Sequence, residues 1–161
     1  MEGSAASRLP GLRQRAESRA VDAAARAYAR LRPRTRALLL RGPQRRLVLR
    51  RIFKAMERQL DPERGARANV VLHWEIARRG GGADRWQLVV ADGRCRASRR
   101  LDREPTATLK LDDEAFLDLV TGSATGPALY MSGRLRVEGD PMRVASLTSA
   151  FRMPRPAPSS R

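Results

Sequence analysis

Alanine and leucine recur at helical spacing between residues 15 and 31, and arginines occupy other positions around the expected helix. The pattern predicts a basic helix, which Pro33 and then Gly42-Pro43 separate from the rest of the chain. We therefore assign residues 1–44 to an Arg- and Ala-rich extension that is partly helical. An Arg-rich start with few acidic residues is also typical of an organellar transit peptide, and a frayed basic helix is the alternative.

A second helical pattern covers residues 45–60 and ends at Asp61-Pro62, because the residue before a proline is disfavoured in the helical conformation. We expect its apolar stripe to pack against a sheet. The alternative is that the helix lies on a membrane with its arginines near anionic head groups. The stripe comprises Leu47, Leu49, Ile52, Phe53, Met56 and Leu60, and the candidate membrane-contact residues are Arg45, Arg46, Arg50 and Arg51.

From residue 69 the apolar period changes from that of a helix to the period of two that is typical of strands. The pattern predicts strands over 69–77, 86–90, 94–98 and 105–111. Asp92-Gly93 is a strong signal for a tight hairpin between the second and third strands. We expect these four strands to form an antiparallel meander.

Two helix starts follow, each with an aspartate that can cap the free amide groups. Asp112 precedes an apolar helix that Gly122 can end in the left-handed conformation. Asp140-Pro141 begins a final helix after a short strand at 135–138. We expect residues 154–161 to be a disordered tail.

Composition limits the chemistry that this chain can perform. A single cysteine, Cys95, and a single histidine, His73, exclude an internal disulfide and a Cys- or His-rich metal site. We find no phosphate-binding glycine loop and no catalytic triad, so we predict no catalytic residues, no metal and no cofactor. The neighbouring arginines can lower the pKa of Cys95, but we expect an unreactive thiol.

The formal net charge of +16 suggests an anionic partner, although its distribution argues against nucleic acid. Residues 1–68 hold 18 Lys and Arg against six Asp and Glu, whereas the remainder is close to an ordinary mixed surface. Aromatic residues make up only 4% of the chain, which leaves few for base stacking. No stretch approaches the roughly 18 apolar residues of a membrane span. We expect a cytoplasmic protein that can associate with anionic membrane surfaces.

Two segments near the end of the chain carry a family resemblance. Asp-Asp-Glu-Ala-Phe-Leu-Asp-Leu-Val-Thr-Gly at 112–122 and Ala-Leu-Tyr-Met-Ser-Gly-Arg-Leu-Arg-Val-Glu-Gly-Asp at 128–140 resemble the sterol carrier protein 2 family. The strand and turn at 86–93 and the strand at 107–111 are also similar to that family. The resemblance covers residues 45–153, which we therefore assign to one SCP2-like lipid-binding domain.

The resemblance implies an α+β fold, in which helices cover one face of a five-stranded, mostly antiparallel sheet and a hydrophobic tunnel lies between the layers. It also implies a ligand such as a sterol, a fatty acyl chain or an isoprenoid lipid. The C-terminal Pro-Ser-Ser-Arg differs from the Ser-Lys-Leu peroxisomal signal of many members. The tunnel-lining candidates are Trp74, Phe116, Leu119, Val120, Leu129, Met131, Leu135, Val137, Met142, Leu147 and Phe151.

Three functional hypotheses follow from these expectations. The first is a non-catalytic carrier of a hydrophobic small molecule. The second is an accessory factor that presents prenylated quinone precursors, or another apolar metabolite, to biosynthetic enzymes. The third is a cyclase or isomerase that uses the tunnel as a mould for an apolar substrate, and no residue in the sequence requires such turnover.

Overall fold

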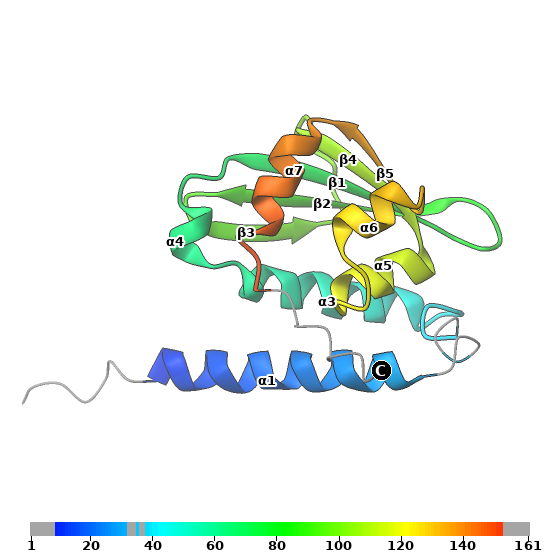
Figure 1. Ribbon diagram of the computed structural model, residues 1–161, viewed down its shortest axis with the longest axis horizontal. Coiled ribbons are helices and arrows are strands. Elements are labelled where there is room, and N and C mark those ends of the chain that lie inside the picture. Colours follow the sequence, from blue (N-terminus) through cyan, green and yellow to red (C-terminus); the bar gives the residue numbers. More distant parts are fainter. Residues whose placement is uncertain (1–8, 32–34, 36–37, 153–161) are drawn as a thin grey trace, which may run out of the picture.

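A computed structural model of the chain describes residues 9–31, 35 and 38–152, so the predicted tail at 154–161 lies outside the described residues. One face of a five-stranded sheet carries α3, α5, α6 and α7, and α1 lies outermost, beside α3 (Figure 1). The helices are α1 (Leu9–Arg30), α3 (Arg45–Gln59), α4 (Pro62–Gly65), α5 (Asp113–Val120), α6 (Gly126–Met131) and α7 (Pro141–Thr148). The strands are β1 (Val70–Ala77), β2 (Ala83–Ala91), β3 (Arg94–Ser98), β4 (Ala107–Asp112) and β5 (Leu135–Gly139).

The strand order is β3-β2-β1-β4-β5, and all neighbours are antiparallel except β1 and β4. This confirms the predicted α+β class with a mostly antiparallel sheet. The predicted meander is wrong at one point, because β4 joins the free edge of β1 in parallel instead of pairing with β3. A parallel neighbour requires the chain to cross the sheet, and periodicity within each strand carries no information about that crossing.

The crossing segment, residues 99–106, lies on the face of the sheet opposite to the helices and is held by Gln87. The Gln87 side chain donates a hydrogen bond to Asp102 (2.6 Å) and accepts one from the Arg103 amide (3.0 Å). At the end of the crossing, the Thr106 amide donates to the Val71 carbonyl at 2.7 Å. The crossing therefore leaves the other face of β1 free for the helices.

The predicted caps and turns form as expected. The Asp112 carboxylate accepts a hydrogen bond from the Ala115 amide (2.7 Å), and Asp140 accepts from the amides of Met142 and Arg143. Asp92 and Gly93 adopt φ values of +51° and +68°, the left-handed pair that a tight hairpin turn requires. Local sequence therefore determined where these elements begin and end.

Four aromatic side chains form the dense part of the core. Phe53 of α3 stacks on Trp86 of β2 at 4.4 Å and on Phe116 of α5 at 5.7 Å between ring centroids. Trp74 of β1 meets the edges of Phe53 and Phe116 at 5.9 and 5.8 Å. These rings fix α3 and α5 on the inner face of the sheet, because aromatic side chains bury large apolar areas in defined geometries.

Arg45 is buried, and it therefore cannot act as the membrane-contact residue that we predicted. It lies four and eight residues before the buried Leu49 and Phe53, so it shares their face of α3. Leu47, which we placed on the apolar stripe, is instead half exposed. The Arg45 guanidinium donates to the carboxylates of Asp84 and Asp113, each at 2.5 Å, and to the carbonyls of Leu40 (3.1 Å) and Ile76 (3.3 Å).

The pKa values of the two carboxylates around Arg45 are shifted in opposite directions. Burial raises the pKa of Asp84, but hydrogen bonds and charge from Arg78 and Arg45 outweigh it and hold that pKa below its ordinary value. For Asp113 burial is the larger influence and raises the pKa, although Arg45 opposes it. Asp84 is therefore the stronger anionic partner of the buried guanidinium.

We expect Asp84→Asn to lower the free energy of unfolding at pH 7 by about 3 kcal/mol, since it removes a charged partner from a buried arginine. The pKa of Asp84 is lowered by folding, so its stabilisation is present above its unfolded-state value, near 3.9, and is lost as the pH falls through the folded-state value. The difference between wild type and variant should therefore shrink below about pH 4. Urea unfolding at pH 7 and pH 3 measures both effects.

Asp113→Asn is the matched control, because burial already disfavours the charged form of that carboxyl. It should lower the free energy of unfolding at pH 7 clearly less than Asp84→Asn does. Equal losses for the two variants, or a loss for Asp84→Asn that is the same at pH 3, would contradict this account.

Candidate functional site

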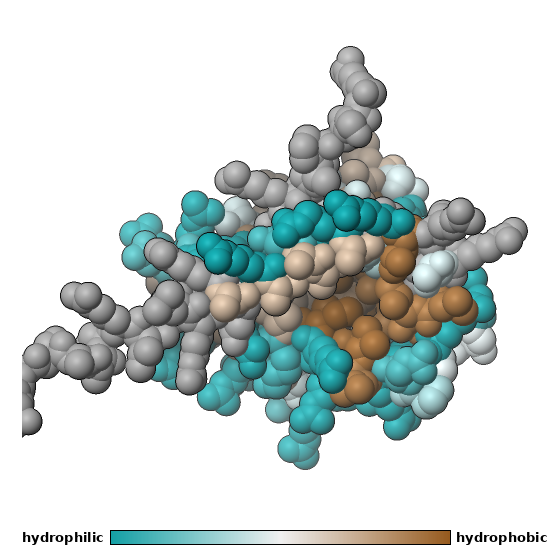
Figure 2. All heavy atoms as spheres, turned by 90° about the horizontal axis from the view of Figure 1, so that it is seen from below, coloured by the Kyte–Doolittle hydropathy of each residue, from teal (hydrophilic) through white to brown (hydrophobic). Residues whose placement is uncertain are grey.

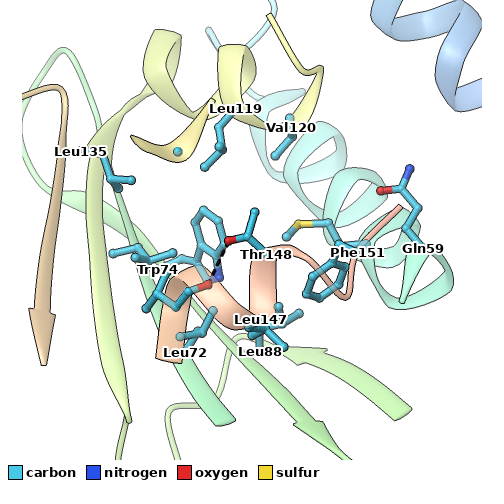
Figure 3. A pocket seen from close by; sticks show the side chains of 14 residues that line it. Gln59, Leu72, Trp74, Leu88, Leu119, Val120, Leu135, Leu147, Thr148 and Phe151 are labelled. Carbon is cyan, nitrogen blue, oxygen red and sulfur yellow. Dashed lines mark hydrogen bonds between the residues drawn. The ribbon is translucent and has the colours of Figure 1, made fainter. Parts of the chain in front are cut away.

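An apolar cavity of about 80 Å³ lies between the inner face of the sheet and the helices. Figure 3 shows α5 and α6 on one side of it, α7 on the opposite side and α3 behind, with the Trp74 ring in its middle. All the residues around it are uncharged. They are Met56, Gln59, Leu72, Trp74, Leu88, Leu109, Leu119, Val120, Gly126, Leu135, Val144, Leu147, Thr148 and Phe151.

The sheet forms a rigid floor for this cavity. Leu72, Trp74, Leu88 and Leu109 come from the three central strands and are almost fully buried. Each lies on the inward face of its strand, at the alternating positions that the sequence pattern predicted. Hydrogen bonds to neighbours on both sides hold these strands in place, so this wall is fixed.

The outer wall, α7, is held much less firmly than the floor. Only Leu147 of this helix is buried, and its remaining side chains are exposed or half-buried. The chain is fastened just outside the helix. The Asp140 amide donates to the Thr106 carbonyl (3.2 Å) at one end, and the Asp61 amide donates to the Ala150 carbonyl (2.9 Å) at the other. An isolated helix of eight residues is unstable in water, so α7 depends on these few contacts.

Six of the eleven predicted ligand-binding residues lie in the cavity wall. The central one is Trp74, whose ring crosses the cavity in Figure 3. The others come from α5, β5 and the chain around α7. They are Leu119, Val120, Leu135, Leu147 and Phe151.

Five predicted residues lie elsewhere. Phe116 and Leu129 are fully packed in the closed core, and Val137 is a half-buried residue of β5 that does not face the cavity. Met131 and Met142 are 83% and 76% exposed, which corrects our expectation for both. Each lies two residues from an inward-facing position of its helix, Leu129 and Val144, and a two-residue step turns a side chain to the opposite side.

Sequence reasoning did not assign most of the floor, or the part of the wall that α3 forms, to the binding site. The period of two placed Leu72 on the same face as Trp74 and predicted that Leu109 points inward, and Leu88 was assigned only to a strand; closed core and cavity wall look identical in such a pattern. Met56 was assigned to the apolar stripe of α3 without a role in binding. Gly126 carried no signal, because its contribution is the absence of a side chain beside Leu119.

The other candidate chemical groups lie away from the cavity. Burial, together with the charge of Glu57, raises the pKa of the Cys95 thiol to about 12, and the flanking arginines lie on exposed positions of β3. His73 lies on the outer face, with Nε2 3.2 Å from Gln87 Oε1. Within the residues that the structure describes, no group of three or more His, Cys, Asp or Glu side chains is placed to hold a metal ion.

A basic surface runs along α3 and α1. Arg46, Arg50 and Arg51 of the predicted membrane-contact set are exposed on α3. Figure 2, seen from the side of α1, shows hydrophilic residues over most of this face and a hydrophobic area beside the helix. Three leucines of this part of the chain, Leu38, Leu39 and Leu47, are substantially exposed. None of the helices described here has the length and apolarity to cross a membrane.

Known proteins resemble this chain in sequence over most of the region around the cavity. The sequence model of a family described as the SCP-2 sterol transfer family matches residues 49–152. A fatty acid-binding protein of Yarrowia lipolytica (strain CLIB 122 / E 150) is 28% identical over 85 residues. That match covers 50% of this chain and 64% of the relative, so the chain spans less than two-thirds of the relative's length.

Two solved structures share the fold. Sterol carrier protein 2 from Yarrowia lipolytica in its apo form is 24% identical, with a TM-score of 0.51 over 63% of this chain and 90% of that one. A UbiJ-SCP2 ubiquinone synthesis protein is 19% identical, with a TM-score of 0.51 over 67% of this chain and 96% of that one. At these identities the likeness concerns the fold.

We expect the backbone amides of α7 to exchange with solvent at least about tenfold faster than those of α5 in the ligand-free protein. The two helices are the same length, eight residues, but α5 buries five side chains and α7 buries one. Hydrogen–deuterium exchange followed by mass spectrometry measures both in one experiment, with β1 as the slow reference. Equal protection of α5 and α7 would show that the outer wall is as firmly held as the rest of the core.

Proposed function

The chain belongs to the SCP-2 sterol transfer family, as the sequence resemblance predicted, and from this premise we propose that it binds and carries an elongated apolar molecule. The observation that carries the proposal is an uncharged cavity with a rigid floor and a loosely held outer helix. Membership supports a lipid-binding role. The identity of the ligand, and the tunnel that would hold it, belong to the proposal.

The cavity must enlarge to accept such a ligand. An apolar cavity of about 150 Å³ can hold benzene, and the space here is about 80 Å³. We propose that α7 moves outward, because Leu147 is its one buried side chain and its backbone attachments lie outside the helix, at Asp140 and between residues 59–61 and 150–152. The three central strands would stay in place.

The energetics suit an apolar chain without a specific charged anchor. Burial of each CH₂ group contributes about 0.8 kcal/mol, so about a dozen contribute about 10 kcal/mol. The loss of free motion on association and the withdrawal of Leu147 oppose this gain. We therefore expect affinities in the micromolar range for a ligand of that length, with broad tolerance for its shape.

We predict that delipidated protein takes up a fluorescent fatty acid or sterol analogue with saturation at one molecule per chain. Gly126→Leu should weaken this binding by about tenfold, a loss of about 1.4 kcal/mol, because the new side chain occupies the cavity. A Cβ at Gly126 meets only Leu119, at 3.9 Å, and the residue is not in the left-handed region, so the substitution introduces little strain. Fluorescence titration measures the affinities.

Met142→Leu is the control, because Met142 is exposed and does not line the cavity. It should bind like the wild type. Absence of saturable uptake by folded wild-type protein would overturn the proposal, and equal weakening by both substitutions would move the binding site away from the cavity.

A second candidate function is that of an accessory factor which presents a prenylated quinone precursor, or a similar apolar metabolite, to biosynthetic enzymes. The observation in its favour is the shared fold with the UbiJ-SCP2 ubiquinone synthesis protein over 96% of that chain. Native mass spectrometry of freshly purified protein tests it. A bound prenylated ring compound supports it, whereas a sterol or a fatty acyl chain favours the general carrier.

The third hypothesis, a cyclase or isomerase, would require a converted product in the same spectra.

Delivery from a membrane gives the exposed arginines of α3 a role in this proposal. Arg46→Gln, Arg50→Gln and Arg51→Gln together should reduce binding to vesicles of anionic lipid, and added salt should reduce wild-type binding in the same way. Co-sedimentation measures both. Arg94→Gln, Arg96→Gln and Arg136→Gln remove equal charge from exposed positions of β3 and β5, on the other face of the sheet. Equal loss of vesicle binding in both triple variants would show that net charge determines the binding and that the position of the arginines on α3 does not.

A further inference from the structure

Trp74 lines the apolar cavity and carries a buried hydrogen-bond donor, its indole Nε1–H. Its side chain is 4% exposed, and its indole Nε1–H has no acceptor within hydrogen-bonding distance among the described residues. In Figure 3 the ring lies across the cavity between Leu119 of α5 and Leu147 of α7, with the nitrogen on the α7 side. A buried donor without an acceptor is unfavourable, so a ligand that brought an acceptor to the Trp74 indole would be bound more tightly.

The polar groups of the wall do not meet this need. Neither Thr148 nor Gln59 accepts a hydrogen bond from Trp74 Nε1: Thr148 Oγ1 lies against the Val144 carbonyl, to which it donates at 2.9 Å, and Gln59 lies at the margin of the cavity in Figure 3. Every described residue that lines the cavity is uncharged, so this part of the site holds no cation that could neutralise a carboxylate. Burying an unpaired charge costs far more than burying a neutral acceptor. An acceptor suited to this site is therefore an oxygen atom without formal charge.

We propose that the ligand is an apolar molecule with a neutral oxygen acceptor, such as a ketone or ester carbonyl, and that this oxygen accepts a hydrogen bond from Trp74 Nε1. The inference rests on the proposed function and deepens it. It assigns ligand selectivity to a single donor in the floor of the cavity. A hydrocarbon brings no acceptor for the indole N–H, and a free carboxylate brings an acceptor but must bury its charge. A neutral carbonyl compound brings an acceptor and buries no charge.

The chain supplies its own internal comparison. Trp86 is its other tryptophan, pairs with Trp74 across β1 and β2, and also has a buried Nε1 without an acceptor among the described residues. It does not line the cavity, because it stacks on Phe53 at 4.4 Å. A ligand in the cavity should therefore affect the indole N–H of Trp74 and leave that of Trp86 unchanged.

The direct test uses ¹⁵N-labelled wild-type protein, whose two indole N–H signals are observed by NMR. We would titrate it with a long-chain methyl ketone, the hydrocarbon of equal length and the fatty acid of equal length at neutral pH. We expect the ketone to move the Trp74 indole signal downfield and to slow its exchange with solvent. The hydrocarbon should leave the signal near its free position, and Trp86 should respond to neither.

Affinities from displacement of a fluorescent probe give the second measurement. The ketone should bind wild-type protein about tenfold more tightly than the hydrocarbon, since a site with a buried donor discriminates against analogues that lack the acceptor. Trp74→Phe should abolish this preference, and Trp86→Phe should retain it. The NMR titration of the wild type stands even if Trp74→Phe folds poorly.

The outcomes separate this inference from the proposed function. If no ligand displaces the probe, the carrier function itself fails. If the ligands bind but the Trp74 indole signal responds equally to ketone and hydrocarbon, or the preference survives in Trp74→Phe, the donor role is overturned and the carrier remains. A fatty acid that binds as tightly as the ketone and moves the Trp74 signal equally would overturn the requirement for a neutral oxygen.

Discussion

The packing of Trp74 against Phe53 and Phe116 is the contact on which the rest of the structure depends. On one side of the indole the three rings close the core, with centroid separations between 5.7 and 5.9 Å. On the other side the same ring borders the cavity. Trp74 therefore divides the space between sheet and helices into a dense half, which fixes α3 and α5, and a hollow half, which α7 covers. One side chain thus belongs both to the closed core and to the cavity wall.

The contrast between α5 and α7 explains how a small domain can hold a hollow without losing its fold. α5 buries five side chains, and its N-terminus is capped by Asp112 at the end of β4. α7 has an equally good cap at Asp140 but buries only Leu147. Good caps define where both helices begin, whereas burial decides how firmly each is held. The domain thus has one helix, α7, that is held by far fewer buried side chains than α5.

Arg45 shows why the basic composition alone is a poor guide to function. We predicted that Arg45 would be one of the membrane-contact arginines, yet it is buried between Asp84 and Asp113 at the ends of β2 and β4. Its position four residues before Leu49 could have revealed its direction. The acidic partners could not have been named, because Asp84 and Asp113 are 39 and 68 residues away and meet Arg45 only in the folded chain.

The sequence by itself determined the five strands, the longer helices and the caps at Asp112 and Asp140, because these depend on neighbours within a few residues, but it did not predict the short helices α4 and α6. The ordered motifs at 112–122 and 128–140 were also sufficient to indicate the family. Only the tertiary structure decided that β4 lies parallel to β1 and that Leu72 and Leu88 border a cavity while Phe116 does not. It also decided that the Trp74 N–H has no acceptor among the residues that the structure describes. Periodicity records which side of a strand avoids water. Whether the space on that side is filled depends on side chains from distant segments, and no local pattern encodes their fit.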